Sequence, residues 1–310
     1  MVRFYSSSIV CLIAFASANS QPIIVAVDGS GNFRTVQEAV NSIPDFNQSS
    51  TTIFIKNGVY KEKVYVSDYK HNITITGESR DSAIITWNDH ARINNMGTFK
   101  TFTMYIGGEN IKLTNLTIEN NAEPLGQAVA LHIEGTKISV SKCRLLGNQD
   151  TLFTGNESGY EYFENCYIEG TTDFIFGPAT VWFENCLIHS KKNSYVTAAS
   201  TVPTRQFGYI FNRCKLTANQ EINKVYLGRP WRPYASVLFM HCELGNHIVP
   251  EGWYNWDKPE REFTVRYMEF ENFGPGASVD KRVKWSRQLN NKEAKLYELS
   301  NVLPGWEPWK

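Results

Sequence analysis

A six-residue phrase of alternating apolar and polar residues recurs along the middle of the chain. Residues 163–168 read FENCYI and residues 183–188 read FENCLI. The fourth position of each phrase, here called the anchor, is occupied by Leu116, Cys143, Cys166, Cys186, Cys214 and Cys242. Successive anchors are 27, 23, 20, 28 and 28 residues apart. A constant phrase at unequal spacing indicates a solenoid whose coils differ mainly in loop length.

The phase of the apolar residues predicts the shape of each coil. Apolar side chains recur five and three residues before the anchor, then at the anchor and two residues after it. Two stretches of period 2 joined by an odd step indicate two strands separated by a bend. Asn115, Asn165 and Asn185 lie at that bend, and asparagine tolerates left-handed backbone angles. We therefore predict an all-β fold, a right-handed parallel β-helix; six matching phrases disfavour the alternative of a β-sandwich.

Helices are predicted only near the two ends of this body. Thr35 and Glu38 fit a capping box, and Val36 and Val40 share one face of the helix that would follow. Residues 292–299 are also helix-like. Short helices of this kind are expected to cover the ends of a solenoid, where unpaired strands would otherwise recruit other chains. Because no linker divides the body, residues 21–310 are interpreted as a single domain.

The first twenty residues have the features of a secretory signal peptide. Arg3 precedes an apolar run at residues 9–18, and residues 18–20 provide a small-x-small cleavage site. We expect residues 1–20 to be removed and the protein to be secreted and extracellular, rather than to begin with a buried strand or helix. Four Asn-x-Ser/Thr sequons, which support secretion weakly, begin at Asn47, Asn72, Asn115 and Asn156.

Secretion bears on the cysteines, because an extracellular compartment is oxidising. Cys166 and Cys186 occupy the same position on consecutive coils at the shortest spacing in the series, and neighbouring strands lie about 4.8 Å apart. These features predict a Cys166–Cys186 disulfide, with a Cys143–Cys166 bridge or buried free thiols as the alternatives. Neither the cysteines nor the six scattered histidines have metal-ligand spacing, so we expect no metal and interpret each histidine as an ordinary surface or core residue.

Composition narrows the classes of partner. The 310 residues contain 31 Lys+Arg and 31 Asp+Glu, and a formal charge of zero without a basic run makes nucleic acid an unexpected ligand. No apolar stretch reaches the roughly 18 residues that a membrane span requires. Aromatic residues are abundant, with 18 Phe, 15 Tyr and 8 Trp, which favours a ligand with flat faces such as a sugar ring.

Two aspartates share one position of the repeat. Asp150 follows Cys143 by seven residues, and Asp173 follows Cys166 by seven. The repeat therefore predicts that both carboxyl groups lie on one face of neighbouring coils. Two close carboxyl groups cannot both ionise freely, so one can serve as an acid and the other as a nucleophile. Two solvated loop aspartates are the alternative.

The segments around this pair resemble one family of enzymes. The matching blocks are QAVAL at residues 127–131, QDTL at 149–152, DFIFG at 173–177 and YLGRPW at 226–231. They resemble the pectin methylesterases (pectinesterases), a family of carbohydrate esterases, and weaker matches extend along nearly all of residues 21–310. Residues 195–200 depart from the pattern expected of plant members.

The resemblance implies a mechanism and a role for each matched residue. Asp173 would be the nucleophile that attacks the C6 methyl ester of homogalacturonan, and Asp150 the acid and then the base. Arg229 would orient Asp173, while Gln127 and Gln149 would donate to the oxyanion. Phe176 and Trp231 are the expected sugar platforms in the matched blocks.

The resemblance also implies the partners. Methylated pectin would be the substrate, with release of methanol and acidic pectin, and no cofactor would be needed. A proteinaceous inhibitor is a further expected partner, whereas nucleic acid and membrane are not, and a monomer is expected.

Two alternatives remain open at this point. A pectin-cleaving glycosidase or lyase on the same solenoid would release no methanol. A catalytically silent β-helix that only binds pectin would not need the paired glutamines, aspartates and arginine together.

Overall fold

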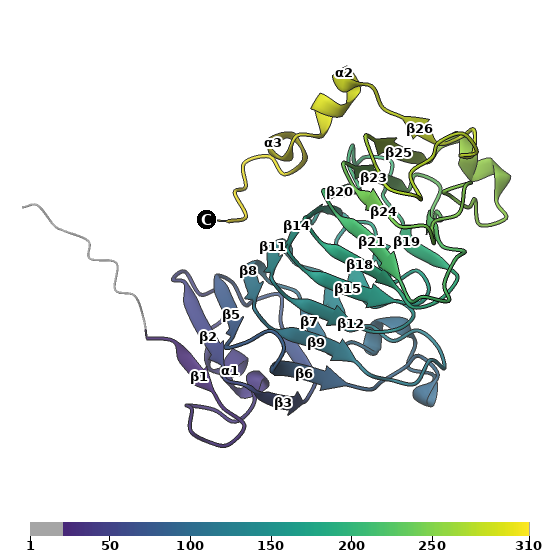
Figure 1. Cartoon of the computed structure of the whole chain (residues 1–310). Coiled ribbons are helices and arrows are strands. Elements are labelled where there is room, and N and C mark those ends of the chain that lie inside the picture. Colours follow the sequence, from purple (N-terminus) through teal and green to yellow (C-terminus); the bar gives the residue numbers. More distant parts are fainter. Residues whose placement is uncertain (1–20, 310) are drawn as a thin grey trace, which may run out of the picture.

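The computed structural model describes residues 21–309, in which three parallel sheets run along a solenoid (Figure 1). Each coil passes through the sheets in the same order, called here sheet A, sheet B and sheet C. Sheet A contains β1 (Ile23–Val25), β2 (Thr51–Ile55), β5 (Ile73–Gly77), β8 (Glu109–Thr114), β11 (Thr136–Ser141), β14 (Tyr160–Glu164), β17 (Thr180–Glu184), β20 (Tyr209–Asn212), β23 (Ser236–Met240), β25 (Arg266–Phe270) and β26 (Arg287–Gln288).

Sheets B and C complete the coils. Sheet B contains β3 (Gly58–Lys61), β6 (Ala83–Trp87), β9 (Thr117–Asn120), β12 (Arg144–Leu146), β15 (Tyr167–Gly170), β18 (Leu187–Ser190), β21 (Lys215–Ala218) and β24 (Glu243–Leu244). Sheet C contains β4 (Val64–Val66), β7 (Met104–Ile106), β10 (Leu131–Ile133), β13 (Leu152–Thr154), β16 (Ile175–Gly177), β19 (Tyr195–Ala199) and β22 (Tyr226–Gly228). The predicted right-handed parallel β-helix is confirmed.

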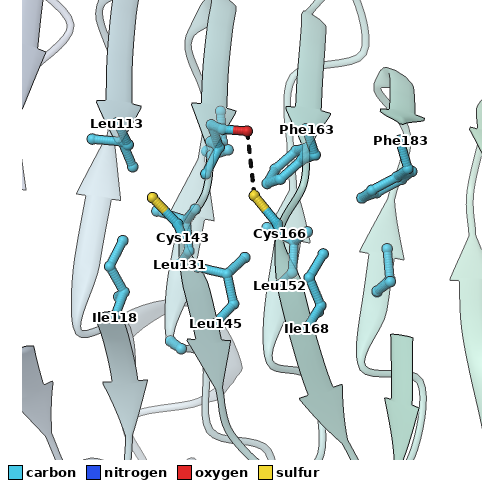
Figure 2. Packing of buried hydrophobic residues seen from close by; sticks show 14 of the residues in the cluster. Leu113, Ile118, Leu131, Cys143, Leu145, Leu152, Phe163, Cys166, Ile168 and Phe183 are labelled. Atoms are coloured by element: carbon cyan, nitrogen blue, oxygen red, sulfur yellow. Dashed lines mark hydrogen bonds between the residues drawn. The ribbon is translucent and has the colours of Figure 1, made fainter. Parts of the chain in front are cut away.

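The interior is built from columns of equivalent residues, as the repeat predicts. Ile138, Val140, Cys143 and Leu145 are all fully buried, and their equivalents in neighbouring coils stack on them. Figure 2 shows the cysteine and aliphatic columns side by side inside the coils. Phenylalanine stacks in the same way: the rings of Phe183 and Phe211 lie 4.4 Å apart and nearly parallel. In-register stacking of like side chains therefore fills the core along the solenoid.

The bend between sheets A and B has the predicted backbone. Asn115, Asn165 and Asn185 adopt φ values of 56°, 53° and 52°. The Asn115 side chain donates to the carbonyl groups of Gly77 and Glu78 on the preceding coil, at 2.9 and 3.1 Å. What the three asparagines share is the left-handed backbone that this residue type tolerates, and at Asn115 the amide also satisfies two backbone carbonyls.

The predicted Cys166–Cys186 disulfide is wrong in the structure, where both residues carry free thiols. In-register parallel strands point equivalent side chains in the same direction, so two stacked sulfur atoms do not face each other as a disulfide requires. Each thiol instead donates to a carbonyl of the preceding coil: Cys166 to Val140 at 3.3 Å (Figure 2) and Cys186 to Phe163 at 3.6 Å. The cysteines therefore act as small buried core residues.

Helices flank the solenoid as predicted at one end and differently at the other. Helix α1 (Val36–Ser42) begins with the predicted capping box of Thr35 and Glu38 and packs on the first coil. The C-terminal α2 (Asn291–Ala294), η4 (Lys295–Tyr297) and α3 (Leu299–Val302) do not close the other end; they run back along the outside of sheet A (Figure 1). The reason is that sheet A carries outward apolar side chains on its later strands, which this segment covers: Tyr162, Trp182, Ile210, Leu238 and Met268.

The predicted signal peptide, residues 1–20, lies outside the described residues. In residues 21–309 no helix has the length and apolar character needed to span a bilayer.

Candidate active site

Asp150 and Asp173 lie on neighbouring coils, each in the turn that leads into sheet C. Strands β13 and β16 pair in register just after them, and the Asp150 amide donates to the Thr172 carbonyl at 3.1 Å. Both aspartates have left-handed backbones, with φ values of 69° and 50°. Aspartate tolerates this conformation better than most residues do, and the turn directs both carboxyl groups to one face of the solenoid.

Arg229 reaches Asp173 across an intervening coil. It follows β22, two coils beyond β16, and its amide donates to the Thr197 carbonyl at 2.9 Å. The register places Ala198 between Phe176 and Arg229, and this small side chain leaves room for the guanidinium. Nε and Nη2 of Arg229 then donate to Oδ1 and Oδ2 of Asp173 at 2.9 and 2.6 Å. This bidentate contact fixes the plane of the Asp173 carboxylate.

Two aromatic rings hold the guanidinium in place. The Cζ atom of Arg229 lies 4.0 Å from the centre of the Tyr195 ring and 3.7 Å from that of Trp256. Trp256 has a φ of 63°, which is unusual for a bulky residue and shows that its loop is held in a strained conformation. Arg229 is therefore constrained on both faces as well as at its hydrogen-bonding edge.

The two carboxyl groups have different electrostatic environments. Burial raises the pKa of Asp150 well above its usual value, the charge of Asp173 raises it further, and Arg229 and a hydrogen bond from Gln149 oppose the rise. Burial also raises the pKa of Asp173, but there the Arg229 hydrogen bonds and charge oppose it directly. Of the two groups, Asp150 is therefore the one that more strongly favours its protonated form, and Asp173 is the one whose ionised form Arg229 stabilises directly.

These side chains open into a cleft of about 210 Å³ on the outer face of sheet C. All seven residues that the sequence singled out for catalysis or substrate binding line it: Gln127, Gln149, Asp150, Asp173, Phe176, Arg229 and Trp231. A second hollow of about 480 Å³ shares Trp231 with the cleft and continues beyond it. The Phe176 and Trp231 rings lie 5.8 Å apart and form an apolar wall.

Sequence reasoning missed five residues around the cleft. Thr98 and Phe99 come from the long connection between β6 and β7, and Trp256 from the connection between β24 and β25. Neither segment belongs to the repeat, so the repeat gave no signal for them. Tyr195 and Ala198 lie in residues 195–200, the stretch that departs from the pattern of plant members, and this departure is the only sequence feature that pointed to them.

The arrangement suits acyl transfer. A buried carboxylate next to a protonated carboxyl group can attack a carbonyl carbon and supply a proton to the leaving group. The side chains of Gln127 and Gln149 face the same cleft and carry amide donors that could stabilise an oxyanion. Within residues 21–309, no group of three His, Cys, Asp or Glu side chains has an arrangement that could hold a metal ion.

Comparison with known proteins gives consistent matches. A family model described as Pectinesterase matches residues 22–305. Pectinesterase 31 of Arabidopsis thaliana is 38% identical over 288 residues, which cover 89% of this chain and 90% of that protein. A pectinesterase/pectinesterase inhibitor of Prunus persica is 36% identical over 94% of this chain but only 59% of its own length. The solved structure of pectin methylesterase from carrot superposes with a TM-score of 0.88 at 33% identity, covering 94% of this chain and 95% of that one.

Proposed function

The chain belongs to the pectinesterase family of carboxylic ester hydrolases, and on this premise we propose that it demethylates pectin through an aspartate nucleophile and an aspartate acid. The observation that carries the proposal is the asymmetry of the pair: both aspartates are buried side by side, but the bidentate contact of Arg229 is made with Asp173. The predicted family and enzyme class are confirmed by the comparisons; the residue roles are our proposal.

In the first half of the reaction, an Asp173 oxygen attacks the C6 carbonyl carbon of a methylated galacturonate. The carbonyl oxygen becomes negative and accepts hydrogen bonds from the Gln127 and Gln149 amides. As the C–O bond to methoxide breaks, Asp150 transfers its proton to the departing oxygen, which leaves as methanol. The sugar is then held as an acyl-enzyme, a mixed anhydride with Asp173.

In the second half, the Asp150 carboxylate removes a proton from water. The resulting hydroxide attacks the acyl carbon, the bond to Asp173 breaks, and the product is a galacturonic acid, which releases its proton to solvent. Asp150 is again protonated and Asp173 is again a carboxylate paired with Arg229. Atoms and charges balance as ester plus water gives acid plus methanol, with no cofactor.

The shape of the site supports a polymeric substrate. The cleft and the adjoining hollow share Trp231, and Phe176 lies beside it, so successive sugar rings can lie along one apolar wall. We propose methylated homogalacturonan as the substrate of a protein that residues 1–20 direct out of the cell. Relatives named pectinesterase/pectinesterase inhibitor support a proteinaceous inhibitor as a further partner.

Two assays on one sample test the proposal. Methanol release and new reducing ends are measured on highly methylated pectin with the purified protein. We expect methanol without new reducing ends. New reducing ends without methanol would instead indicate a glycosidase, and new ends that carry an unsaturated uronide would indicate a lyase. Pectin binding with neither product would indicate a silent binding protein.

A further inference from the structure

His132 lies in the middle of β10 on the outer face of sheet C, inside a cage of aromatic rings. Its side chain is almost fully buried, with 5% exposed. Four rings surround the imidazole, at centre-to-centre distances of 4.8 Å for Phe153, 4.9 Å for Tyr105, 6.0 Å for Phe102 and 6.2 Å for Phe99. An aromatic cage of this kind favours a cation at its centre.

Both ring nitrogens of His132 contact hydrogen-bond acceptors. Nδ1 lies 3.2 Å from the carbonyl oxygen of Phe99, and Nε2 lies 2.9 Å from Oε1 of Glu134. A carbonyl oxygen and an ionised carboxylate can only accept, so satisfying both contacts requires a proton on each nitrogen. The Glu134 side chain is 37% exposed and reaches solvent. The hydrogen-bond pattern thus indicates an imidazolium.

The Nδ1 contact holds one wall of the catalytic cleft. Phe99 belongs to η2 (Thr98–Lys100), and Thr98 and Phe99 both line the cleft that contains the aspartates. The residues just before η2 have left-handed backbones: Asn94, Asn95 and Gly97 have φ values of 49°, 52° and 74°. This irregular segment gives η2 little support of its own, so contacts from the sheet determine its position.

We propose that His132 is a positioning residue that, as an imidazolium, holds the Phe99 wall of the cleft against sheet C. The inference rests on the proposed pectinesterase function of this cleft. His132 is not among the residues that line the cleft; it acts through the backbone carbonyl of Phe99. It is therefore expected to control the KM for pectin more than kcat.

If His132 loses one proton, its hydrogen bond to the Phe99 carbonyl breaks. A neutral imidazole donates from a single nitrogen, and the bond to the negative Glu134 is the stronger of the two, so the remaining proton stays on Nε2. The Nδ1 lone pair then faces the Phe99 carbonyl and repels it. Lys63 still donates to the Lys100 carbonyl at 2.6 Å, so η2 loosens locally without unfolding.

Other ionisable groups nearby contact the surrounding aromatic rings rather than the imidazole itself. Asp68 contacts the Tyr105 hydroxyl at 3.4 Å, and Lys63 lies 4.7 Å from the centre of the Phe102 ring. Burial raises the pKa of Tyr105, so its phenol stays neutral when the imidazole titrates. Glu134 is the group in direct contact with His132, which makes it the partner to alter.

The test measures KM and kcat from about pH 6 to pH 9 with a fully methylated oligogalacturonide, whose charge does not change over this range. In Glu134→Gln, the amide can donate to a neutral Nε2, so Nδ1 keeps its proton and its bond to Phe99 at every pH. His132→Phe keeps an aromatic ring in the cage but removes both donors. His189→Gln is the matched control, because His189 lies on sheet B and bonds to Thr217 and Asn219, away from the cleft.

We expect the wild-type KM to rise about fivefold towards high pH, which corresponds to one hydrogen bond, and the control to behave alike. Glu134→Gln should show no such rise, and His132→Phe should have the higher KM throughout. A wild-type KM that is constant with pH, or an equal rise in Glu134→Gln, would overturn the proposal even if His132→Phe does not fold. A ¹⁵N spectrum of the ring at pH about 6 gives a second readout: a single protonated nitrogen would also overturn it. A wild-type protein that releases no methanol would instead refute the proposed function.

Discussion

Arg229→Lys tests how much of the rate depends on the geometry of the guanidinium rather than on its charge. Lysine keeps a positive charge but cannot reproduce the two parallel bonds to Asp173 at 2.9 and 2.6 Å. Nor can its ammonium lie flat between Tyr195 and Trp256. The substitution therefore leaves the Asp173 carboxylate charged but free to rotate.

The magnitude follows from the contacts that are lost. One hydrogen bond to a charged group contributes about 1.5–3 kcal/mol, and cation–π contact with two rings about 0.5–2 kcal/mol more. If about 2–4 kcal/mol of this is expressed in the transition state, kcat falls by a factor of about 30 to 1,000. KM should change less, because Phe176 and Trp231 remain in place.

The assay is initial-rate methanol release at saturating pectin. Arg213→Lys is the control, because Arg213 lies at the surface corner between sheets A and B, where its side chain is 65% exposed. The control should retain wild-type kcat. Arg229→Lys with a normal melting temperature and a kcat within about threefold of wild type would refute the claim that the bidentate geometry positions the nucleophile.

Three further outcomes are expected. Glu161 is fully buried inside the solenoid, neither carboxyl oxygen has a partner among residues 21–309, and burial raises its pKa well above the usual value. Because the folded-state pKa is raised, the protein is most stable at low pH, where Glu161 is neutral, and loses stability as the pH rises. Glu161→Gln should therefore leave the melting temperature unchanged at pH about 4 and increase it at pH about 9. An equal change at both pH values would contradict this. In protein without residues 1–20, all five cysteines should alkylate after denaturation without reductant, and peptide mapping that finds any disulfide-linked pair would contradict the structure. Trp231→Ala should increase the KM for pectin about tenfold, since one aromatic platform is lost, with little effect on kcat; an unchanged KM would remove Trp231 from the sugar path.

The repeat made most of the fold predictable from sequence. Period-2 apolar positions, a bend at Asn115 and a constant phrase around each anchor follow from stacking equivalent residues, and a stack repeats its constraints in every coil. The same regularity placed Asp150 and Asp173 on neighbouring coils. The failed disulfide shows the limit of this reasoning: spacing places two sulfur atoms close together but does not set the direction of their side chains.

The parts that could not be predicted lie outside the repeat. Thr98, Phe99 and Trp256 reach the cleft from irregular loops whose positions depend on tertiary contacts. The C-terminal helices cover sheet A because of outward residues such as Trp182 and Leu238, which one-dimensional patterning did not distinguish from the core. His132 was interpreted as an ordinary residue because its two acceptor contacts appear only in the folded chain.

The most direct test of the central claim is methanol release by Asp173→Asn. The substitution keeps the shape of the side chain and removes the nucleophilic charge, so the protein should fold with an unchanged coil structure and melting temperature near that of the wild type. The wild-type protein should release methanol from methylated pectin, and a homogeneous preparation of Asp173→Asn should release none above background. Wild-type rates from that variant would contradict the assignment of Asp173 as the nucleophile.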